Sequence, residues 1–208
     1  KGIDVIETRV IKDDIEKIIT VINEVRKKYD YIFTTGGIGP THDDVTAVSI
    51  AKAFKVKLKK NKEALNLLKK YYKVKKIPMN DAKEKMALIP HGAELLHNPI
   101  TKAAGFKMKN VYVMAGLPEI MVAMFEKIIR NIKGGNRKIT KNIPINLPES
   151  DIAEYLSKIQ NEFNQVEIGS YPLFRNKKKK VNVVLTGFNK IDINEVERKI
   201  KKFINFIK

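Results

Sequence analysis

A glycine-rich turn that follows a short β-rich run constrains this chain more than any other feature. Residues 31–35 are all aromatic or β-branched and lead directly into Gly36 and Gly37. A helical pattern follows over residues 43–54, with apolar side chains at helical spacing. A short β-rich run between helices is typical of a central strand in a parallel sheet. The sequence therefore predicts an α/β fold.

The other residues up to 137 continue this alternation of strands and amphipathic helices. We expect the strands at 3–11, 93–98 and 108–114. We expect the helices at about 15–25, 62–72 and 118–132, with a further helix that begins near Met79. Together these elements predict a three-layer α/β sandwich with a mainly parallel sheet over residues 1–137.

A polar stretch with two glycines, residues 133–137, is the best candidate for a domain boundary. The pattern beyond it is strand, helix, strand, strand, helix, at residues 139–145, 150–163, 166–170, 181–186 and 192–207. This order predicts a small β-α-β-β-α module, an α+β domain, over residues 138–208.

Composition limits the possible partners. The 208 residues carry a net charge of +18, from 41 basic and 23 acidic side chains. Six of the basic residues are Arg, the usual reader of bases and phosphates, so we expect a solvated lysine surface and no nucleic-acid partner. The positive charge suits an anionic small molecule. No run reaches the ~18 apolar residues of a membrane span. The absence of Cys fits a reducing compartment, and we expect a cytoplasmic protein without membrane contact.

The glycine-rich turn has two interpretations. Its three glycines, Gly36, Gly37 and Gly39, would let backbone N–H groups approach an anion at a helix N-terminus. The adjacent carboxylates Asp43 and Asp44 would then hold a divalent metal that bridges to a phosphate. In the other interpretation, Thr41 and Asp44 form a capping box and the glycines only shape the turn. The first interpretation predicts a pocket beside the turn, at the carboxyl end of the strand.

Several segments together resemble a known family. Residues 34–41 and 43–46 (Thr-Thr-Gly-Gly-Ile-Gly-Pro-Thr and Asp-Asp-Val-Thr) are similar to the signature loop of the molybdopterin-binding domain superfamily. Residues 90–93, 115–119 and 169–172 resemble its CinA-like, competence/damage-inducible branch. The N-terminal domain of eukaryotic FAD synthase is related to this branch. The family begins about one strand and one helix earlier, so we expect that part to be missing here.

The resemblance implies roles for particular residues. It makes Asp44 and Asp13 catalytic, and Asp43 with Asp44 ligands of a divalent metal, Mg²⁺ first, with Co²⁺ or Mn²⁺ as alternatives. It assigns phosphate or nucleotide binding to Thr35, Gly36, Gly37, Gly39, Thr41, Thr46, Gly116 and Pro118. From the residues alone, Asp13 is equally an ordinary helix N-cap with Glu16 as its partner. Asn80 and Lys85 are further candidates for a phosphate contact, although solvated surface is the default for both.

The resemblance also implies an activity. It indicates a metal-dependent nucleotide pyrophosphatase, a hydrolase that acts on ADP-ribose, FAD or a similar dinucleotide. Two alternatives stay open: molybdopterin binding with adenylyl transfer in molybdenum cofactor biosynthesis, and an inactive nucleotide-binding or interaction protein. In each case the small-molecule partner is an anionic nucleotide or pterin. We expect the chain to form a homodimer or homotrimer.

Overall fold

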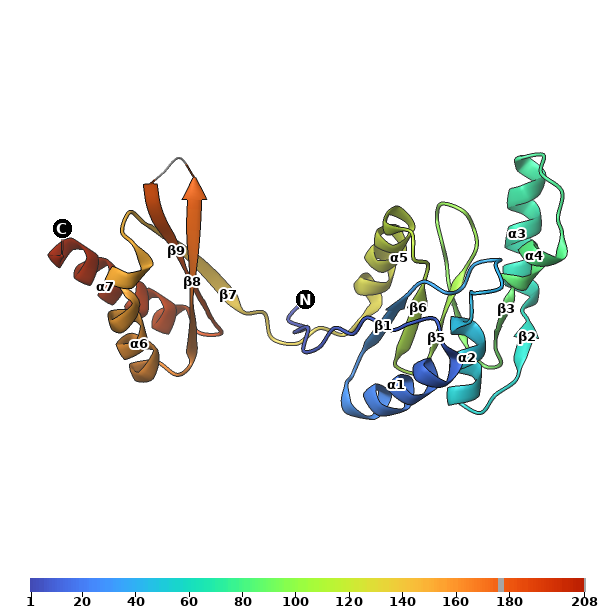
Figure 1. Ribbon diagram of the computed structural model, residues 1–208, viewed down its shortest axis with the longest axis horizontal. Helices are drawn as coiled ribbons and strands as arrows, with labels where there is room; N and C mark the ends of the chain where they lie inside the picture. Colours follow the sequence, from blue (N-terminus) through green and yellow to red (C-terminus); the bar gives the residue numbers. More distant parts are fainter. Residues whose placement is uncertain (176–177, 208) are drawn as a thin grey trace. The chain divides into compact units, whose positions relative to one another are not determined.

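The chain folds into two compact units. The computed structural model describes residues 1–175 and 178–207. It describes side chains for all of these residues except 173–175 and 178–180. The first unit is Glu7–Ile132, and the second is Lys133–Lys208 together with Lys1–Ile6. Figure 1 shows the helices and strands of each unit. No helix in the described ranges is both long and apolar enough to cross a membrane.

The first unit is built on a mixed four-stranded sheet. Its strands, in spatial order, are β1 (Ile32–Thr35), β6 (Val111–Met114), β5 (Gly105–Met108) and β4 (Glu94–Leu96). β1 and β6 are parallel, whereas β6 with β5 and β5 with β4 are antiparallel. The α/β fold class is confirmed, but the sheet is mixed and not mainly parallel as expected: one pair of its described strands is parallel and two are antiparallel.

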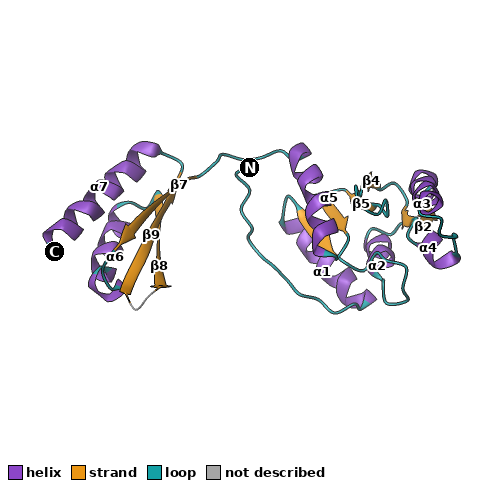
Figure 2. Ribbon diagram, turned by 90° about the horizontal axis from the view of Figure 1, so that it is seen from above, coloured by secondary structure: helices purple, strands orange, loops and turns teal. Residues whose placement is uncertain are grey.

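Helices cover both faces of this sheet and make three layers (Figure 2). The helices concerned are α1 (Ile15–Lys28), α2 (Thr46–Ala53) and α5 (Pro118–Asn131). Val111 and Val113 of β6 join the core cluster of α1 and α2. Between them in the strand, Tyr112 points to the other face, where its ring stacks on Phe33 at 5.2 Å. Phe33 in turn meets Phe125 of α5, with ring centroids 5.3 Å apart.

The prediction of a central strand at residues 31–35 is wrong. β1 pairs with β6 alone, so it is an edge strand of the described sheet. Ile32 packs toward α1 and α2, while Phe33 packs toward α5. A strand covered on both faces is apolar on both faces, and its sequence does not show how many strands lie beside it.

The strand predicted at residues 3–11 is also wrong. This segment forms no helix or strand, and Val10 is fully exposed. Its polar side chains bind α1 instead: the Arg9 guanidinium donates to both carboxylate oxygens of Glu24, at 2.8 and 2.6 Å, and also to Glu7. The β-branched residues indicated strand propensity, but a strand needs a neighbour to pair with.

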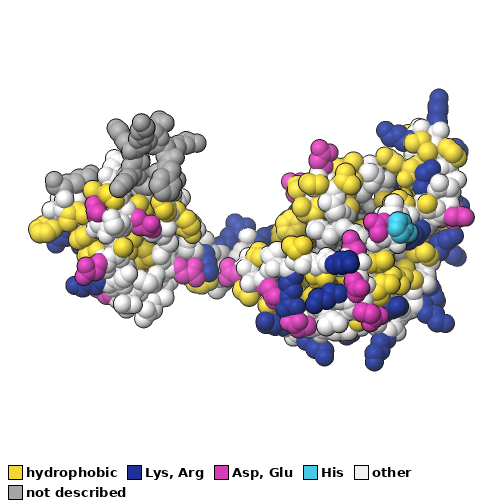
Figure 3. Space-filling view, viewed as in Figure 1, with side chains coloured by type: hydrophobic (Ala, Val, Ile, Leu, Met, Phe, Trp, Pro, Cys, Tyr) yellow, Lys and Arg dark blue, Asp and Glu magenta, His cyan; other side chains and the backbone are white. Residues whose placement is uncertain are grey.

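Beside the sheet lies a smaller group of elements that the sequence revealed only in part. It comprises β2 (Leu58–Lys60), α3 (Lys62–Val74), α4 (Asp81–Lys85) and β3 (Leu88–Pro90), with β2 and β3 antiparallel. The helix expected near Met79 is the short α4. Ala64, Leu68 and Ala87 form the buried centre of this group. The lysines of the visible face are interspersed with acidic groups (Figure 3), which is typical of a solvated surface.

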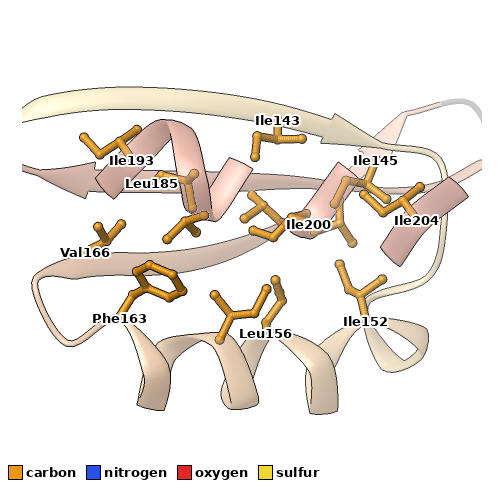
Figure 4. Close-up of a cluster of buried hydrophobic side chains, with 14 residues drawn as sticks. Ile143, Ile145, Ile152, Leu156, Phe163, Val166, Leu185, Ile193, Ile200 and Ile204 are labelled. Atoms are coloured by element: carbon orange, nitrogen blue, oxygen red, sulfur yellow. The ribbon is translucent and has the colours of Figure 1, made fainter. Parts of the chain in front are cut away.

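The second unit is a three-stranded antiparallel sheet with helices on one face. Its elements are β7 (Ile139–Ile145), η1 (Glu149–Asp151), α6 (Ala153–Glu162), β8 (Val166–Arg175), β9 (Lys178–Gly187) and α7 (Lys190–Phe206), and the strand order is β7-β9-β8. The helix predicted at 150–163 is interrupted at Ile152, which separates η1 from α6. Figure 4 shows the fully apolar core, in which Leu185 and Ile200 are about 1% exposed or less.

Candidate functional site

The site is built around the glycine-rich turn that leads from β1 into α2. Gly36 and Gly37 have φ angles of 92° and 68°, in the left-handed region that favours glycine. The Gly36 N–H donates to the Met114 carbonyl at 3.0 Å, and the Thr46 N–H donates to the Gly37 carbonyl at 2.9 Å. A Cβ on Gly37 would lie 2.0 Å from Thr46 Oγ1. The turn therefore lies tightly against the start of α2.

A second turn, from β6 into α5, meets the first. Because β1 and β6 are parallel neighbours, their carboxyl ends lie at the same edge of the sheet. A Cβ on Gly116 would lie 3.0 Å from the Cα of Gly36. Pro118 then opens the first turn of α5. The two backbones approach closely because both positions are glycine.

Both helices that begin at these turns lack a side-chain cap. The N-cap residues are Val45 for α2 and Leu117 for α5, and neither side chain accepts a hydrogen bond from the helix. The other helices of this unit are capped by Asp14, Asn61 and Asn80. Apart from the Thr46 N–H, which bonds to the Gly37 carbonyl, these two N-termini have backbone N–H groups and partial positive charge without a side-chain cap. The absence of caps at these two ends favours an anion as their partner.

The Asp44 carboxylate is hydrogen-bonded to the glycine turn. Its Oδ2 accepts hydrogen bonds from the Thr41 N–H at 2.8 Å and from the Thr41 hydroxyl at 2.5 Å. Burial alone would raise the pKa of Asp44, but the bonds from Thr41 and the Gly39 N–H and the charge of Lys85 together lower it. A Cβ on Gly39 would lie 2.6 Å from Asp44 Oδ2. Asp44 is thus an ionised, half-buried anchor of the turn.

Two more charged residues lie at this turn. Lys85, at the end of α4, donates from Nζ to the carbonyl of Thr41. Asp43 is exposed, and a hydrogen bond from the Thr41 side chain lowers its pKa. The turn therefore carries a cation from another part of the unit and an accessible carboxylate of its own.

The structure brings most of the predicted site residues together and separates one of them. At the turn or the neighbouring helix starts lie Thr35, Gly36, Gly37, Gly39, Thr41, Asp43, Asp44, Thr46, Gly116 and Pro118. The prediction that Asp13 caps α1 is wrong, because Asp14 is the N-cap and accepts from the Lys17 N–H at 2.8 Å. Asp13 is exposed, and no hydrogen bond or ion pair joins it to the turn within the described part of the chain.

Sequence reasoning gave Lys85 and Asn80 the same weight, and the structure distinguishes them. Asn80 caps α4 by accepting from the Lys83 N–H at 3.0 Å, whereas Lys85 reaches the turn. Lys85 and Thr41 are 44 positions apart, so no local pattern signals their contact. The missing cap of α5 was visible in the sequence as Leu117, where Ser, Thr, Asp or Asn is usual. That of α2 was not, because the helix was expected from residue 43 and begins at Thr46.

The carboxylates at the turn determine how a metal ion can be held there. In residues 1–175 and 178–207, no group of three or more His, Asp or Glu side chains is placed to hold a metal ion. Asp43 and Asp44 supply two carboxylates, and both accept hydrogen bonds from Thr41. Mg²⁺ is usually held by one or two carboxylates together with substrate phosphates and water. The pair fits a metal only in that shared manner.

The turn is open to solvent, with residues 40–43 exposed. Two cavities, of about 690 and about 400 Å³, lie in the second unit, and neither is lined by this turn. The pocket expected beside the turn stays a prediction.

Fold and site together define an α/β protein with a candidate anion-binding edge at two glycine turns. Residues 1–134 match the family described as "Probable molybdopterin binding domain", and residues 137–206 match "FAD synthase, middle domain". The chain belongs to the molybdopterin-binding-domain family, in its CinA-like branch.

Individual relatives agree with this assignment. A protein of Archaeoglobus fulgidus is 34% identical over 193 residues, which are 93% of this chain and 79% of that protein. A CinA-like protein of Desulfosudis oleivorans is 32% identical, over 75% of this chain and 40% of its own length. The crystal structure of the protein CinA, of unknown function, from Thermoplasma acidophilum superposes with a TM-score of 0.52 at 28% identity, covering 57% of this chain and 72% of that one. The chain thus matches less than half of the CinA-like protein's length.

Proposed function

We propose that this chain is a nucleotide pyrophosphatase that binds the diphosphate of its substrate at the paired glycine turns. One observation carries the proposal: two uncapped helix N-termini follow adjacent parallel strands, and their turns meet at Gly36 and Gly116. Each N-terminus offers N–H donors to one phosphate group. Two such ends at one sheet edge suit two linked phosphates, as in ADP-ribose or FAD.

Three side chains at the turn have separate roles in the proposed function. Lys85 brings positive charge to the turn, where it offsets the charge of a bound phosphate. Asp44 fixes the shape of the turn through Thr41, and Asp43 is exposed to solvent. In the reaction, water adds to one phosphorus, one P–O bond of the bridge breaks, and two phosphate monoesters leave. AMP is one product when the substrate is ADP-ribose or FAD.

A divalent metal is part of the proposal in a limited way. Asp43 and Asp44 would hold such an ion, which would polarise a substrate phosphate and offset developing charge. Asp43 is the more accessible ligand, because it is exposed, whereas Asp44 is half-buried and its Oδ2 accepts two hydrogen bonds from Thr41.

The family match supports one alternative, molybdopterin binding, because the family is described by that ligand. The terminal phosphate of molybdopterin would occupy the same N–H donors. Only hydrolysis of a diphosphate bridge separates the two functions, since both need the glycine turns.

The experiment is to incubate the purified chain with ADP-ribose and, separately, FAD, with Mg²⁺ or with EDTA, and to measure AMP by chromatography. The proposal expects AMP in the Mg²⁺ samples and little in the EDTA samples. A chain that binds molybdopterin but releases no AMP with Mg²⁺, Mn²⁺ or Co²⁺ would replace the proposal with the alternative.

A further inference from the structure

The second unit contains an open groove that the proposed function does not use. It has a volume of about 400 Å³ and lies between α6 and β8. Its apolar side chains are Ala153, Leu156 and Ile168, and its polar ones include Ser157, Gln160 and Ser170. Gly-Ser-Tyr-Pro, residues 169–172, was singled out in the sequence and lies on this strand. The proposed function uses the turns of the first unit and therefore leaves this groove without a role.

β8 is an edge strand, and one end of its free edge is already occupied. The strand order β7-β9-β8 gives β8 a ladder partner on one side only. On the other side the Gln160 amide pairs with the backbone: Nε2 donates to the Val166 carbonyl at 2.9 Å, and Oε1 accepts from the Ile168 N–H at 2.9 Å. Residues 166, 168, 170 and 172 therefore direct their backbone groups away from β9.

Beyond Gln160 the edge is unpaired. Among the described residues, the carbonyls of Ile168, Ser170 and Pro172 and the N–H of Ser170 have no hydrogen-bond partner. Pro172 has no N–H to offer. The Ser170 hydroxyl is buried and also without a partner. This short edge therefore offers three backbone acceptors and one backbone donor to a ligand, beside a buried hydroxyl of the kind that is normally paired.

The charge of the elements that line the groove indicates what kind of ligand. Glu149 lines the groove, and Asp151 and Glu154 are exposed residues of η1 and α6, which supply its lining; these three acidic residues are called the rim. None of the three forms an ion pair in the described part of the chain. These three carboxylates lie close together in the sequence, and without ion pairs they complement a ligand with Lys or Arg side chains.

We propose that the β8 edge and the groove beside α6 bind an extended, basic peptide segment of another protein by strand addition. An added strand supplies backbone N–H groups to the carbonyls at 168, 170 and 172 and a carbonyl to the Ser170 N–H. One of its aliphatic side chains fills the space between Leu156 and Ile168. Its basic side chains meet the carboxylates of the rim.

A second copy of this chain fits the edge less well. In a two-fold antiparallel pairing about Ser170, residue 172 of one copy stands opposite residue 168 of the other. Pro172 has no N–H for the Ile168 carbonyl, and the Ile168 N–H is already taken by Gln160. Only the two hydrogen bonds of the Ser170 pair remain, whereas a proline-free partner pairs with all three carbonyls.

The test uses a fluorescein-labelled hexapeptide that alternates lysine with valine, titrated with the full chain and followed by anisotropy. Two control peptides accompany it: one with glutamate in place of lysine, and one with N-methylated central residues that cannot donate. We expect saturable binding of the basic peptide, and binding weaker by about tenfold or more for each control. The N-methylated peptide keeps its charges, so it separates strand addition from general attraction to the rim.

Variants of α6 locate the binding. Ser157→Trp fills the groove from an exposed position, and Lys158→Trp places the same side chain at the next exposed position, outside the lining. We expect Ser157→Trp to weaken peptide binding by about tenfold and Lys158→Trp to leave it unchanged, with equal melting temperatures. No saturable binding at millimolar peptide, or binding insensitive to Ser157→Trp or to N-methylation, would overturn the proposal. So would a dimer in sedimentation equilibrium that Ser157→Trp dissociates, because a second copy would then be the occupant.

Discussion

Asp44 Oδ2 accepts two hydrogen bonds from one residue, Thr41: its N–H at 2.8 Å and its hydroxyl at 2.5 Å. The carboxylate therefore ties the glycine turn to its own residue, which directly precedes Val45, the N-cap of α2. The same residue is a predicted metal ligand, so its structural and catalytic roles need to be separated by experiment.

Asp44→Asn separates these two roles. Asn retains one oxygen that accepts hydrogen bonds, so we expect the free energy of unfolding to fall by about 1 kcal/mol or less. The charge is lost, so under the proposed function AMP release should fall by about a hundredfold. Thermal unfolding and AMP release are measured on the same preparations. Unchanged turnover in an active wild type would remove Asp44 from the reaction and leave it as an anchor.

Gly37→Ala tests the crowding at the turn. Gly37 and Gly92 both have positive φ, 68° and 84°, but a Cβ meets Thr46 Oγ1 at 2.0 Å in the first case and nothing within 4 Å in the second. Gly92→Ala should cost about 1 kcal/mol for backbone strain alone. Gly37→Ala should cost a further ~1–3 kcal/mol for overpacking. Equal losses in urea unfolding would show that the turn relaxes away from Thr46.

Lys85→Met tests the cation at the turn. Lys73, exposed on α3, is the matched control, because Lys73→Met lowers the net charge equally. Loss of the Lys85 charge should raise KM for ADP-ribose by about tenfold, as expected for one charged phosphate contact, while Lys73→Met should leave KM unchanged. A similar rise of KM in both variants would show that the effect comes from the net charge of the protein and not from a phosphate contact of Lys85.

Glu7 gives a prediction for pH. Hydrogen bonds from Arg9 and then from Tyr29 lower the pKa of Glu7 from 4.5 to about 2. A lowered carboxyl pKa stabilises the folded state above the unfolded pKa, and this contribution is lost as pH falls through the folded value. The stability difference between wild type and Glu7→Gln should be constant above about pH 5 and shrink between pH 4.5 and 2. Urea unfolding across this range checks it; a difference that persists unchanged to pH 2 would contradict it.

The sequence predicted long elements better than short ones. Helices α1, α5 and α7 carry apolar residues at helical spacing over several turns, and each was predicted close to its observed range. Strands β2, β3 and β5 have three or four residues, too few for an alternating pattern, and were missed. The edge position of β1 was not predictable because it depends on which strands pair, not on the strand's own residues.

The site shows the same division between local and long-range information. The glycines and Asp44 lie within one continuous motif, so sequence alone placed them together. The contact of Lys85 with Thr41 depends on how α4 packs beside the turn. The choice of Asp14 over Asp13 as N-cap depends on a shift of one residue at the helix start, which propensity does not resolve.

If the two glycine turns bind the diphosphate together, Gly116→Ala should weaken that binding. A Cβ at this position lies 3.0 Å from the Gly36 Cα, so it pushes the turns apart without removing a charged or polar group. The measurement is the Kd of ADP-ribose by titration calorimetry, with EDTA present to prevent turnover, for wild type, Gly116→Ala and the control Gly92→Ala. We expect saturable binding to wild type and Gly92→Ala, and binding weaker by about tenfold or more to Gly116→Ala at unchanged melting temperature. Equal affinity for all three proteins, or no binding to wild type, would contradict it.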